Sequence, residues 1–262
     1  MLEPIQSLWI GESLSNVEQL CIRSFLDNGH PFILYTYSHI KNLPDGVTIE
    51  DANQILPANT IFTYKEGWGK GSYAGFADLF RFTLLQKKGG WWVDTDVICL
   101  KPFEFSSDLI ICSSYEGQWE SCPNSCILKI PKDHFFVNHI LNEVYKKDIE
   151  NINFGAIGPS LIQQAVADLK LEYAVVPYYY FNPVSWSNVS DIILGNLTLK
   201  NKIKEICRPF FKPHTLPGRK LHKDSFAIHL WNEVWRQSNF EKNATYSKFS
   251  TFEKLKKKYG IK

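Results

Sequence analysis

The segment from Ser72 to Asp96 constrains the fold of this chain more than any other stretch. It reads SYAGFADLFRFTLLQKKGGWWVDTD: apolar side chains recur every three to four residues up to a glycine pair, and a bulky apolar run then ends in two carboxylates. The first part predicts an amphipathic helix that ends at Gly89, and the bulky run predicts a buried strand that ends at Asp94. The helix residues predicted to face the core are Leu79, Phe82, Thr83 and Leu85. We therefore expect a helix packed on a sheet, with acidic groups at the end of one strand.

The N-terminal residues predict an α/β arrangement. Residues 5–10 read as a short buried strand, residues 13–28 as a helix and residues 31–37 as a second strand. A strand, a helix and a strand in this order favour a nucleotide-binding α/β half. A loop rich in Gly, Pro and Asn is expected up to about residue 71. The remaining expected elements are strands near 108–112, 126–130, 173–177 and 226–231, helices near 134–147 and 159–169, and a lysine-rich terminal helix.

Length and composition allow one sizeable domain. The chain has 262 residues, of which 44% are apolar and 15% aromatic, enough to bury a full core. No stretch approaches the roughly 18 apolar residues of a membrane span, and the first basic residue, Arg23, comes too late for the charged start of a signal peptide. We therefore expect a cytoplasmic protein. The six cysteines lack the paired spacing of a zinc finger, so buried free thiols are expected.

Charge is distributed unevenly along the chain. Residues 1–198 carry 13 basic and 22 acidic side chains, whereas residues 199–262 carry 16 basic and 5 acidic ones. This asymmetry predicts an anionic partner at the C-terminal end, either a phosphate-bearing ligand or a membrane surface.

The last residues, KFSTFEKLKKKYGIK, place lysines among aromatic and aliphatic side chains. Such a helix end fits an anionic headgroup surface, so peripheral docking at the inner face of the membrane is one interpretation. The other is that the apolar positions pack on the domain while the lysines complement the helix C-terminus. The lysines concerned are Lys248, Lys254, Lys256, Lys257, Lys258 and Lys262.

Asp94 and Asp96 are the strongest candidates for chemistry. Ligands of α/β sheets gather at the carboxyl ends of strands, which is where this strand delivers both carboxylates. Two hard oxygen ligands suit Mn²⁺ or Mg²⁺, a cation that bridges phosphate oxygens and neutralises a leaving diphosphate. The alternative is a solvated turn between two strands.

Residues 77–103, ADLFR to CLKPF, resemble the donor-binding core of the DXD-containing glycosyltransferases of the GT-A fold. The shared features are a helical Asp78 and Arg81, a glycine stop, a short strand, the Asp-x-Asp and a trailing Pro-Phe pair. The nearest group is the family 32 type, which includes bacterial capsular and lipopolysaccharide transferases, initiating mannosyltransferases and α1,4-galactosyltransferases. SLWIGESL (7–14) is similar to an entry motif shared with clostridial glucosylating toxins, and HLWNEVW (229–235) to a C-terminal motif of the family.

The resemblance implies a Rossmann-like nucleotide-binding fold with a mixed central sheet flanked by helices. It implies a single domain over residues 1–262, with a nucleotide-sugar half at about 1–105 and an acceptor-side half with a basic C-terminal helix at about 106–262.

The resemblance also implies roles for individual residues. Trp9 would stack on the nucleotide base, and Asp78 and Arg81 would reach the ribose, the sugar or the diphosphate. The alternatives are a core tryptophan and an i,i+3 ion pair on the surface. The helix that starts in GAIGPSLIQQA (155–165) would turn its N-terminus toward the donor or the acceptor.

The metal ligands implied by the resemblance come from two distant segments. Asp96 would be the principal ligand, Asp94 would contact both the metal and the donor, and His229 would complete the metal sphere from the end of the chain. A hydrogen-bonded core histidine is the alternative for His229.

These features favour a retaining, metal-dependent transferase with Arg81, Asp94 and Asp96 in the catalytic set. It would move a hexose from a nucleotide sugar, UDP-linked by preference, to a saccharide hydroxyl in surface polysaccharide synthesis, with an acceptor that is soluble or lipid-linked. No nucleic-acid partner is expected. An effector that glycosylates a host protein has the same chemistry and stays open.

Two readings outside the transferases also stay open. The Asp-x-Asp after an apolar run imitates the nucleophile strand of haloacid-dehalogenase-like phosphatases, although the chain contains no Asp-Asp or Gly-Asp pair for their second acidic cluster. A carbohydrate-binding module would account for 8 Trp and 12 Tyr, but it leaves the carboxylates without a task.

Overall fold

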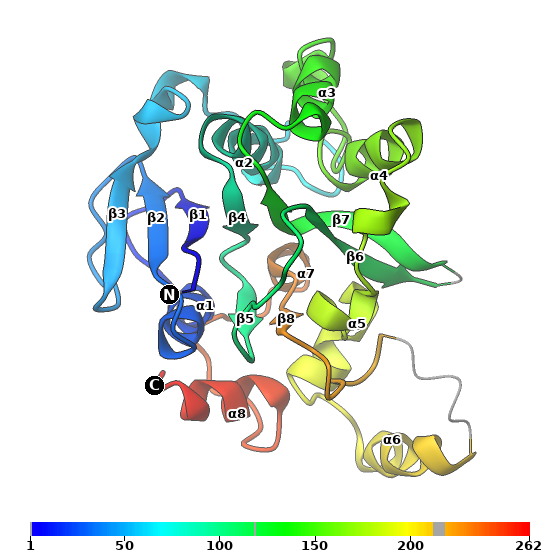
Figure 1. Cartoon of the computed structure of the whole chain (residues 1–262). Coiled ribbons are helices and arrows are strands. Elements are labelled where there is room, and N and C mark those ends of the chain that lie inside the picture. The colour runs from blue at the N-terminus through cyan, green and yellow to red at the C-terminus, as the bar shows by residue number, and fades with distance from the viewer. Residues whose placement is uncertain (1, 118, 212–217) are drawn as a thin grey trace.

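The computed structural model describes residues 2–117, 119–211 and 218–262 (Figure 1). Its centre is a six-stranded sheet in the order β3-β2-β1-β4-β7-β6. The strands β1 to β4 run parallel to their neighbours in this order, whereas β7 is antiparallel to both β4 and β6. The strands are β1 (Ile5–Trp9), β2 (Phe32–Thr36), β3 (Val47–Asp51), β4 (Gly90–Val93), β6 (Ile110–Glu116) and β7 (Trp119–Ile130). The predicted mixed central sheet is confirmed.

Helices cover both faces of this sheet. One core cluster joins α1 and α8 to the sheet, and a second cluster joins α2, α3 and α4 to its other side. The helices are α1 (Asn16–Asp27), α2 (Ala74–Lys88), α3 (Phe135–Val144), α4 (Pro159–Asp168), α5 (Tyr178–Phe181), α6 (Leu199–Phe211), α7 (Asn232–Gln237) and α8 (Thr251–Lys258). No helix among the described residues is long and apolar enough to cross a bilayer.

The predicted helices begin and end for local reasons. At the start of α1, Ser15 donates its backbone N–H to the carboxylate of Glu18 at 2.8 Å, which completes a capping box. The helix α2 ends at Gly89, which has φ 69°, a conformation that disfavours side chains. All four α2 residues predicted to face the core are buried.

The tryptophan pair of β4 fills both cores. Successive side chains of a strand point to opposite faces of a sheet. Trp91 therefore packs in the cluster with α1, and Trp92 packs in the cluster with α2. Both are buried, which explains why a central strand of four residues carries so much apolar volume.

Two sequence expectations are wrong in detail. The expected strand at 173–177 is a short 3₁₀ turn followed by a single bridge from Val175 to Ile111. The expected loop before residue 71 contains the edge strand β3, whose polar residues gave no apolar signal. The expected strand near 226–231 is confirmed as β8 (Ala227–His229), which pairs with β5 (Val97–Cys99) in a sheet of two strands.

The lysine-rich terminal helix α8 packs on the domain with its apolar face. Phe252, Leu255 and Tyr259 are buried in the core cluster with α1, and even Lys256 is buried, with its ammonium group 3.1 Å from Glu253. This is the packing arrangement that the sequence left open as the alternative to membrane docking by the tail.

The close approach of Gly89 to the loop between β7 and α3 predicts a large loss of stability for any side chain at this position. A Cβ on Gly89 would lie 2.4 Å from the backbone nitrogen of Lys132. We expect Gly89→Ala to lower the free energy of unfolding about 1–3 kcal/mol more than a matched control does, because the backbone must shift. Urea denaturation measures the free energy of unfolding of this variant and of the control.

The control is Gly260→Ala, at the end of α8. Gly260 has φ 70°, but a Cβ there would meet nothing within 4 Å. It should therefore show only the cost of a left-handed alanine, about 1–2 kcal/mol. Equal losses in the two variants would contradict the packing argument.

Candidate functional site

The two aspartates lie at the carboxyl edge of the central sheet. The strand β4 ends at Val93, and Asp94, Thr95 and Asp96 then lead into β5. β1 runs parallel to β4, with Gln6 opposite Trp92, so Trp9 at the end of β1 lies at the same edge. The sheet therefore gathers the predicted donor-binding and metal-binding residues on one side.

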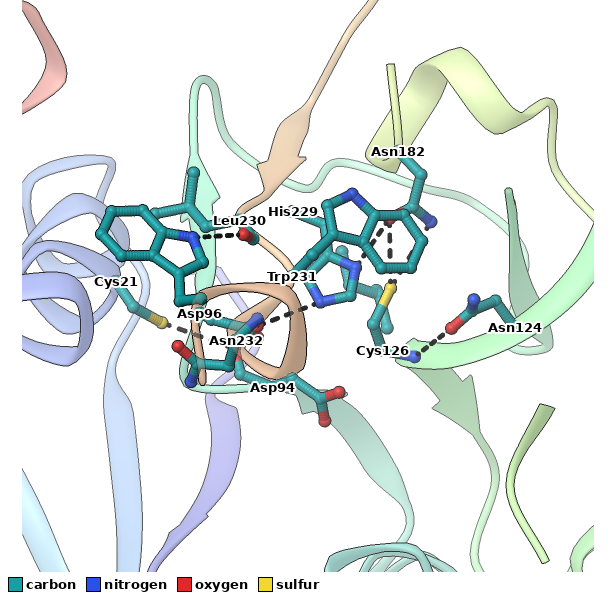
Figure 2. A network of polar contacts seen from close by, with 12 residues as sticks. Cys21, Asp94, Asp96, Asn124, Cys126, Asn182, His229, Leu230, Trp231 and Asn232 are labelled. Atoms are coloured by element: carbon teal, nitrogen blue, oxygen red, sulfur yellow. Dashed lines mark hydrogen bonds and ion pairs between the residues drawn. The ribbon is translucent and has the colours of Figure 1, made fainter. Parts of the chain in front are cut away.

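The pairing of β5 with β8 brings His229 to the aspartates from the other end of the chain. Val97 is the register partner of His229, and the imidazole Nε2 lies 3.2 Å from Oδ2 of Asp96. One ligand atom each from Asp94, Asp96 and His229 lies within 4.8 Å of the others, and Figure 2 shows these side chains together. This spacing fits a single divalent cation, which binds such ligands at about 2.0–2.2 Å.

Asn182 orients the imidazole and was not predicted from the sequence. Its amide nitrogen donates to the carbonyl of Ser113 at 2.8 Å, which turns the amide oxygen toward Nδ1 of His229 at 3.1 Å. Because an amide oxygen can only accept, Nδ1 carries a proton and donates it. Nε2 is therefore the nitrogen that faces the aspartates, the arrangement expected of a supported metal-binding histidine.

Charge interactions hold Asp96 and His229 in their ionised forms. Burial opposes ionisation of Asp96, but the charge and hydrogen bond of His229 and the N–H of Asn232 outweigh it and lower the pKa of Asp96. Burial likewise opposes protonation of His229, but Asp96 raises the pKa of His229 well above its usual value. The carboxylate of Asp96 is thus anionic, the state in which it can bind a cation, whereas His229 binds one only after Nε2 has released its proton.

Asp94 is held at one oxygen. Its Oδ1 accepts hydrogen bonds from the indole of Trp92 at 2.7 Å and from Nη2 of Arg81 at 2.8 Å. Burial raises the pKa of Asp94, with the neighbouring Asp96 adding to the shift and Arg81 opposing it. Both donors bind the same oxygen, so the position of this carboxylate is fixed by contacts that leave Oδ2 to other partners.

Arg81 is buried between two aspartates. Its Nη1 contacts Oδ1 of Asp78 at 3.0 Å and donates to the carbonyl of Ser125 at 2.8 Å, while Nη2 binds Asp94. The Asp78 and Arg81 side chains are only 7% and 4% exposed, so the i,i+3 pair forms but the surface alternative is wrong. Burial raises the pKa of Asp78 to about 6, although Arg81 opposes the shift.

The start of α4 packs against Asp78. A Cβ on Gly158, the residue that precedes α4, would lie 2.4 Å from Oδ2 of Asp78. Only glycine therefore allows the carboxylate to approach the helix start, where the helix dipole favours a negative charge. The Gly-Pro helix start therefore adjoins a predicted site residue, and its orientation toward the donor or the acceptor stays a prediction.

Trp9 is partly exposed at the end of β1. Its indole nitrogen donates to the carbonyl of Ser13 at 3.1 Å, which fixes the plane of the ring. The ammonium group of Lys242 lies 6.0 Å from the ring centroid and 2.6 Å from the carboxylate of Glu18. Because one part of the ring packs on the core and another is accessible, Trp9 is not the fully buried residue of the core alternative.

The turn after β8 adds Trp231 and Asn232, two residues of the HLWNEVW segment to which the sequence analysis assigned no role. Trp231 has φ 59° and ψ 63°, a left-handed conformation that is costly for a large side chain and often found at functional sites. This turn directs the N–H of Asn232 at Oδ2 of Asp96, at 2.6 Å. The side-chain oxygen of Asn232 is buried and has no hydrogen-bond partner among the described residues.

The matched family is described as a glycosyltransferase sugar-binding region containing a DXD motif, and the match covers residues 15–116. That range contains Asp78, Arg81 and both aspartates of the turn. Residues 15–116 thus match a glycosyltransferase region of the DXD type. The resemblance inferred from the sequence is confirmed at this level. No curated protein matches the chain.

Solved glycosyltransferases of low sequence identity are similar to this DXD chain. The glycosyltransferase domain of the YGT toxin is 9% identical, with 99% of this chain and 97% of that chain covered and a TM-score of 0.46. The PaToxG glycosyltransferase is 15% identical, with 90% and 84% covered and a TM-score of 0.44. GlyE of Streptococcus pneumoniae TIGR4 is 11% identical, with 92% and 61% covered and a TM-score of 0.43. Scores below 0.5 assign neither a donor nor an acceptor to this chain.

The burial of Arg81 predicts that this residue is needed for stability. Arg81→Met should lower the free energy of unfolding by about 3–5 kcal/mol, because it leaves the buried carboxylate of Asp78 and the partly buried carboxylate of Asp94 without their counter-charge. Urea denaturation followed by circular dichroism measures the loss.

A helical ion pair on the surface provides the control. Arg23 and Asp27 form an i,i+4 pair with side chains 43% and 36% exposed. Arg23→Met should cost at most about 1 kcal/mol. A loss for Arg81→Met as small as that of the control would show that the buried pair does not hold the site together.

Proposed function

We propose that this protein is a retaining, metal-dependent glycosyltransferase that moves a hexose from UDP to a hydroxyl of a growing saccharide. One observation carries the proposal: Asp94 and Asp96 of a DXD region meet His229, from a segment far along the chain, within 4.8 Å. A carbohydrate-binding module would have no use for such a cluster at the carboxyl edge of its sheet.

The residues fit a divalent cation. Two carboxylates and an oriented imidazole are ligand types that suit Mn²⁺, and the buried side-chain oxygen of Asn232 is a further donor of the kind that hard cations accept. Asp94, Asp96 and His229 would hold the ion. When bound, it would neutralise the charge that develops on the departing diphosphate.

The chain's own residues position the donor. The accessible part of Trp9 offers a flat surface for the uracil ring, at the same sheet edge as the aspartates. Arg81 can reach the diphosphate only by giving up a contact with Asp78 or Asp94, so we assign it the role of holding Asp94 in place. Asp78 is proposed to accept a hydrogen bond from a hydroxyl of the ribose or the sugar.

Retention of the anomeric configuration is supported by the family resemblance rather than by an identified nucleophile. An α-linked hexose donor should therefore give an α-linked product, which NMR of the product determines. Synthesis of a surface polysaccharide, on an acceptor that is lipid-linked or soluble, is the proposed setting.

The metal hypothesis predicts the behaviour of Asp96→Asn. The amide preserves the shape of the side chain and can still accept from the N–H of Asn232, but it lacks the negative charge. Hydrolysis of UDP-hexoses by the variant should fall at least ~100-fold, because several kcal/mol of charge stabilisation are lost. Chelator should abolish wild-type turnover, and Mn²⁺ should restore it.

Asp45→Asn, at an exposed position, controls for the loss of one carboxylate and should leave turnover unchanged. Thermal melting of both variants checks that folding survives. Full activity of Asp96→Asn in chelator would reject the metal-dependent mechanism.

The stacking hypothesis predicts a weaker nucleotide complex in Trp9→Ala. Loss of one base–aromatic contact should weaken UDP binding by about 1–3 kcal/mol, as measured by calorimetry. Trp186→Ala is the matched control, because Trp186 is also a partly exposed tryptophan whose indole donates a hydrogen bond, here to Glu116. Equal UDP affinities of a folded Trp9→Ala and the control would return Trp9 to a packing role.

A further inference from the structure

The helix α6 exposes a continuous apolar stripe. Its residues Leu199, Ile203, Ile206 and Phe210 are 76%, 55%, 70% and 82% exposed. They are spaced four, three and four residues apart, which places them on one face of a helix. In Figure 1 this helix projects from the lower right of the molecule, away from the central sheet. The stripe is thus an apolar surface that none of the residues described by the structure covers.

The surroundings of the stripe are basic. The sequence of α6 contains four Lys or Arg residues and one acidic residue, and Lys200 and Lys204 are exposed beside the stripe. The chain that leads into α6 passes the start of α8: a Cβ on Gly195 would contact Cβ of Ser250 at 3.2 Å. Beside that contact, Lys248 and Phe249 are also exposed, with the ammonium group 5.1 Å from the ring centroid.

The size and shape of the stripe argue against a protein partner. A helix of 13 residues is about 20 Å long, and its apolar face consists of only four side chains. A stable protein interface needs about 800 Å² from each partner. A lipid surface requires no matching shape, and a projecting helix with an apolar face and basic flanks is the form that lies in a membrane interface.

We propose that α6 is an interfacial anchor that inserts Leu199, Ile203, Ile206 and Phe210 among the headgroups of an anionic membrane. Lys200 and Lys204 bind the negatively charged lipid headgroups at its edge. This surface differs from the one expected from the lysine-rich tail, because α8 buries its apolar face and has only exposed lysines such as Lys257 and Lys258 to contribute. The anchor does not depend on the proposed transferase chemistry.

Cosedimentation of the full chain with vesicles tests the proposal. Wild type should bind vesicles containing 30% phosphatidylglycerol, in a salt-sensitive way, and should bind pure phosphatidylcholine vesicles at least ~10-fold more weakly. Ile206→Ser with Phe210→Ser should lower the partition coefficient on anionic vesicles at least ~10-fold. Lys200→Glu with Lys204→Glu should lower it and reduce its salt dependence.

Matched controls separate this anchor from exposed apolar or basic residues in general. Tyr145→Ser with Tyr173→Ser removes two equally exposed aromatic side chains elsewhere, and Lys132→Glu with Lys147→Glu reverses two distant charges. Both controls should bind within about twofold of wild type, and circular dichroism should show every variant folded.

Three results would overturn the proposal. The first is equal binding of wild type and the Ile206 and Phe210 variant, or no binding of wild type at all. The second is a loss in Lys257→Glu with Lys258→Glu as large as that of the α6 variants, which would assign the surface to the tail. The third is a concentration-dependent dimer, seen by light scattering and abolished by the α6 substitutions, which would make the stripe a contact between two copies.

Discussion

The candidate site depends on one buried guanidinium. Arg81 lies between Asp78 and Asp94 and also binds the carbonyl of Ser125, so a single side chain of α2 links its own helix, the end of β4 and the strand β7. Burying a charge is costly unless it is paired and hydrogen-bonded, and this one is paired twice. The start of α4 then closes against Asp78, where Gly158 leaves room for the carboxylate. Four elements thus meet around one charge, and the position of Asp94 follows from it.

The second constraint is the short pairing of β5 with β8. Only three residues of each strand are paired, yet this pairing brings a histidine of the C-terminal segment to Asp96, in the turn that follows β4. The left-handed turn at Trp231 follows at once and aims the next N–H at the same carboxylate. The two-stranded sheet therefore adds His229 to the part of the site that the central sheet positions.

Sequence reasoning recovered the parts of the fold that local patterns determine. The helix α2, its glycine stop and β4 follow from apolar periodicity and from the conformation of Gly89, and the aspartates follow from their place after a strand. The edge strand β3 was missed because its side chains are mostly exposed, so it has no apolar alternation. The expected strand at 173–177 failed because its apolar residues pack beside β6 with a single bridge. Asn182 could not be found, because its role comes only from the tertiary contact with His229.

The division of the site between two distant segments has a consequence for how such proteins diversify. The recognised DXD region ends at residue 116, so it contains both aspartates but neither the imidazole nor the amide that orients it. Under the proposed metal role of His229, the third ligand can therefore be exchanged in the C-terminal segment without any change in the matched DXD region. Because imidazole and carboxylate ligands favour different cations, such an exchange would change the metal that the proposed site prefers.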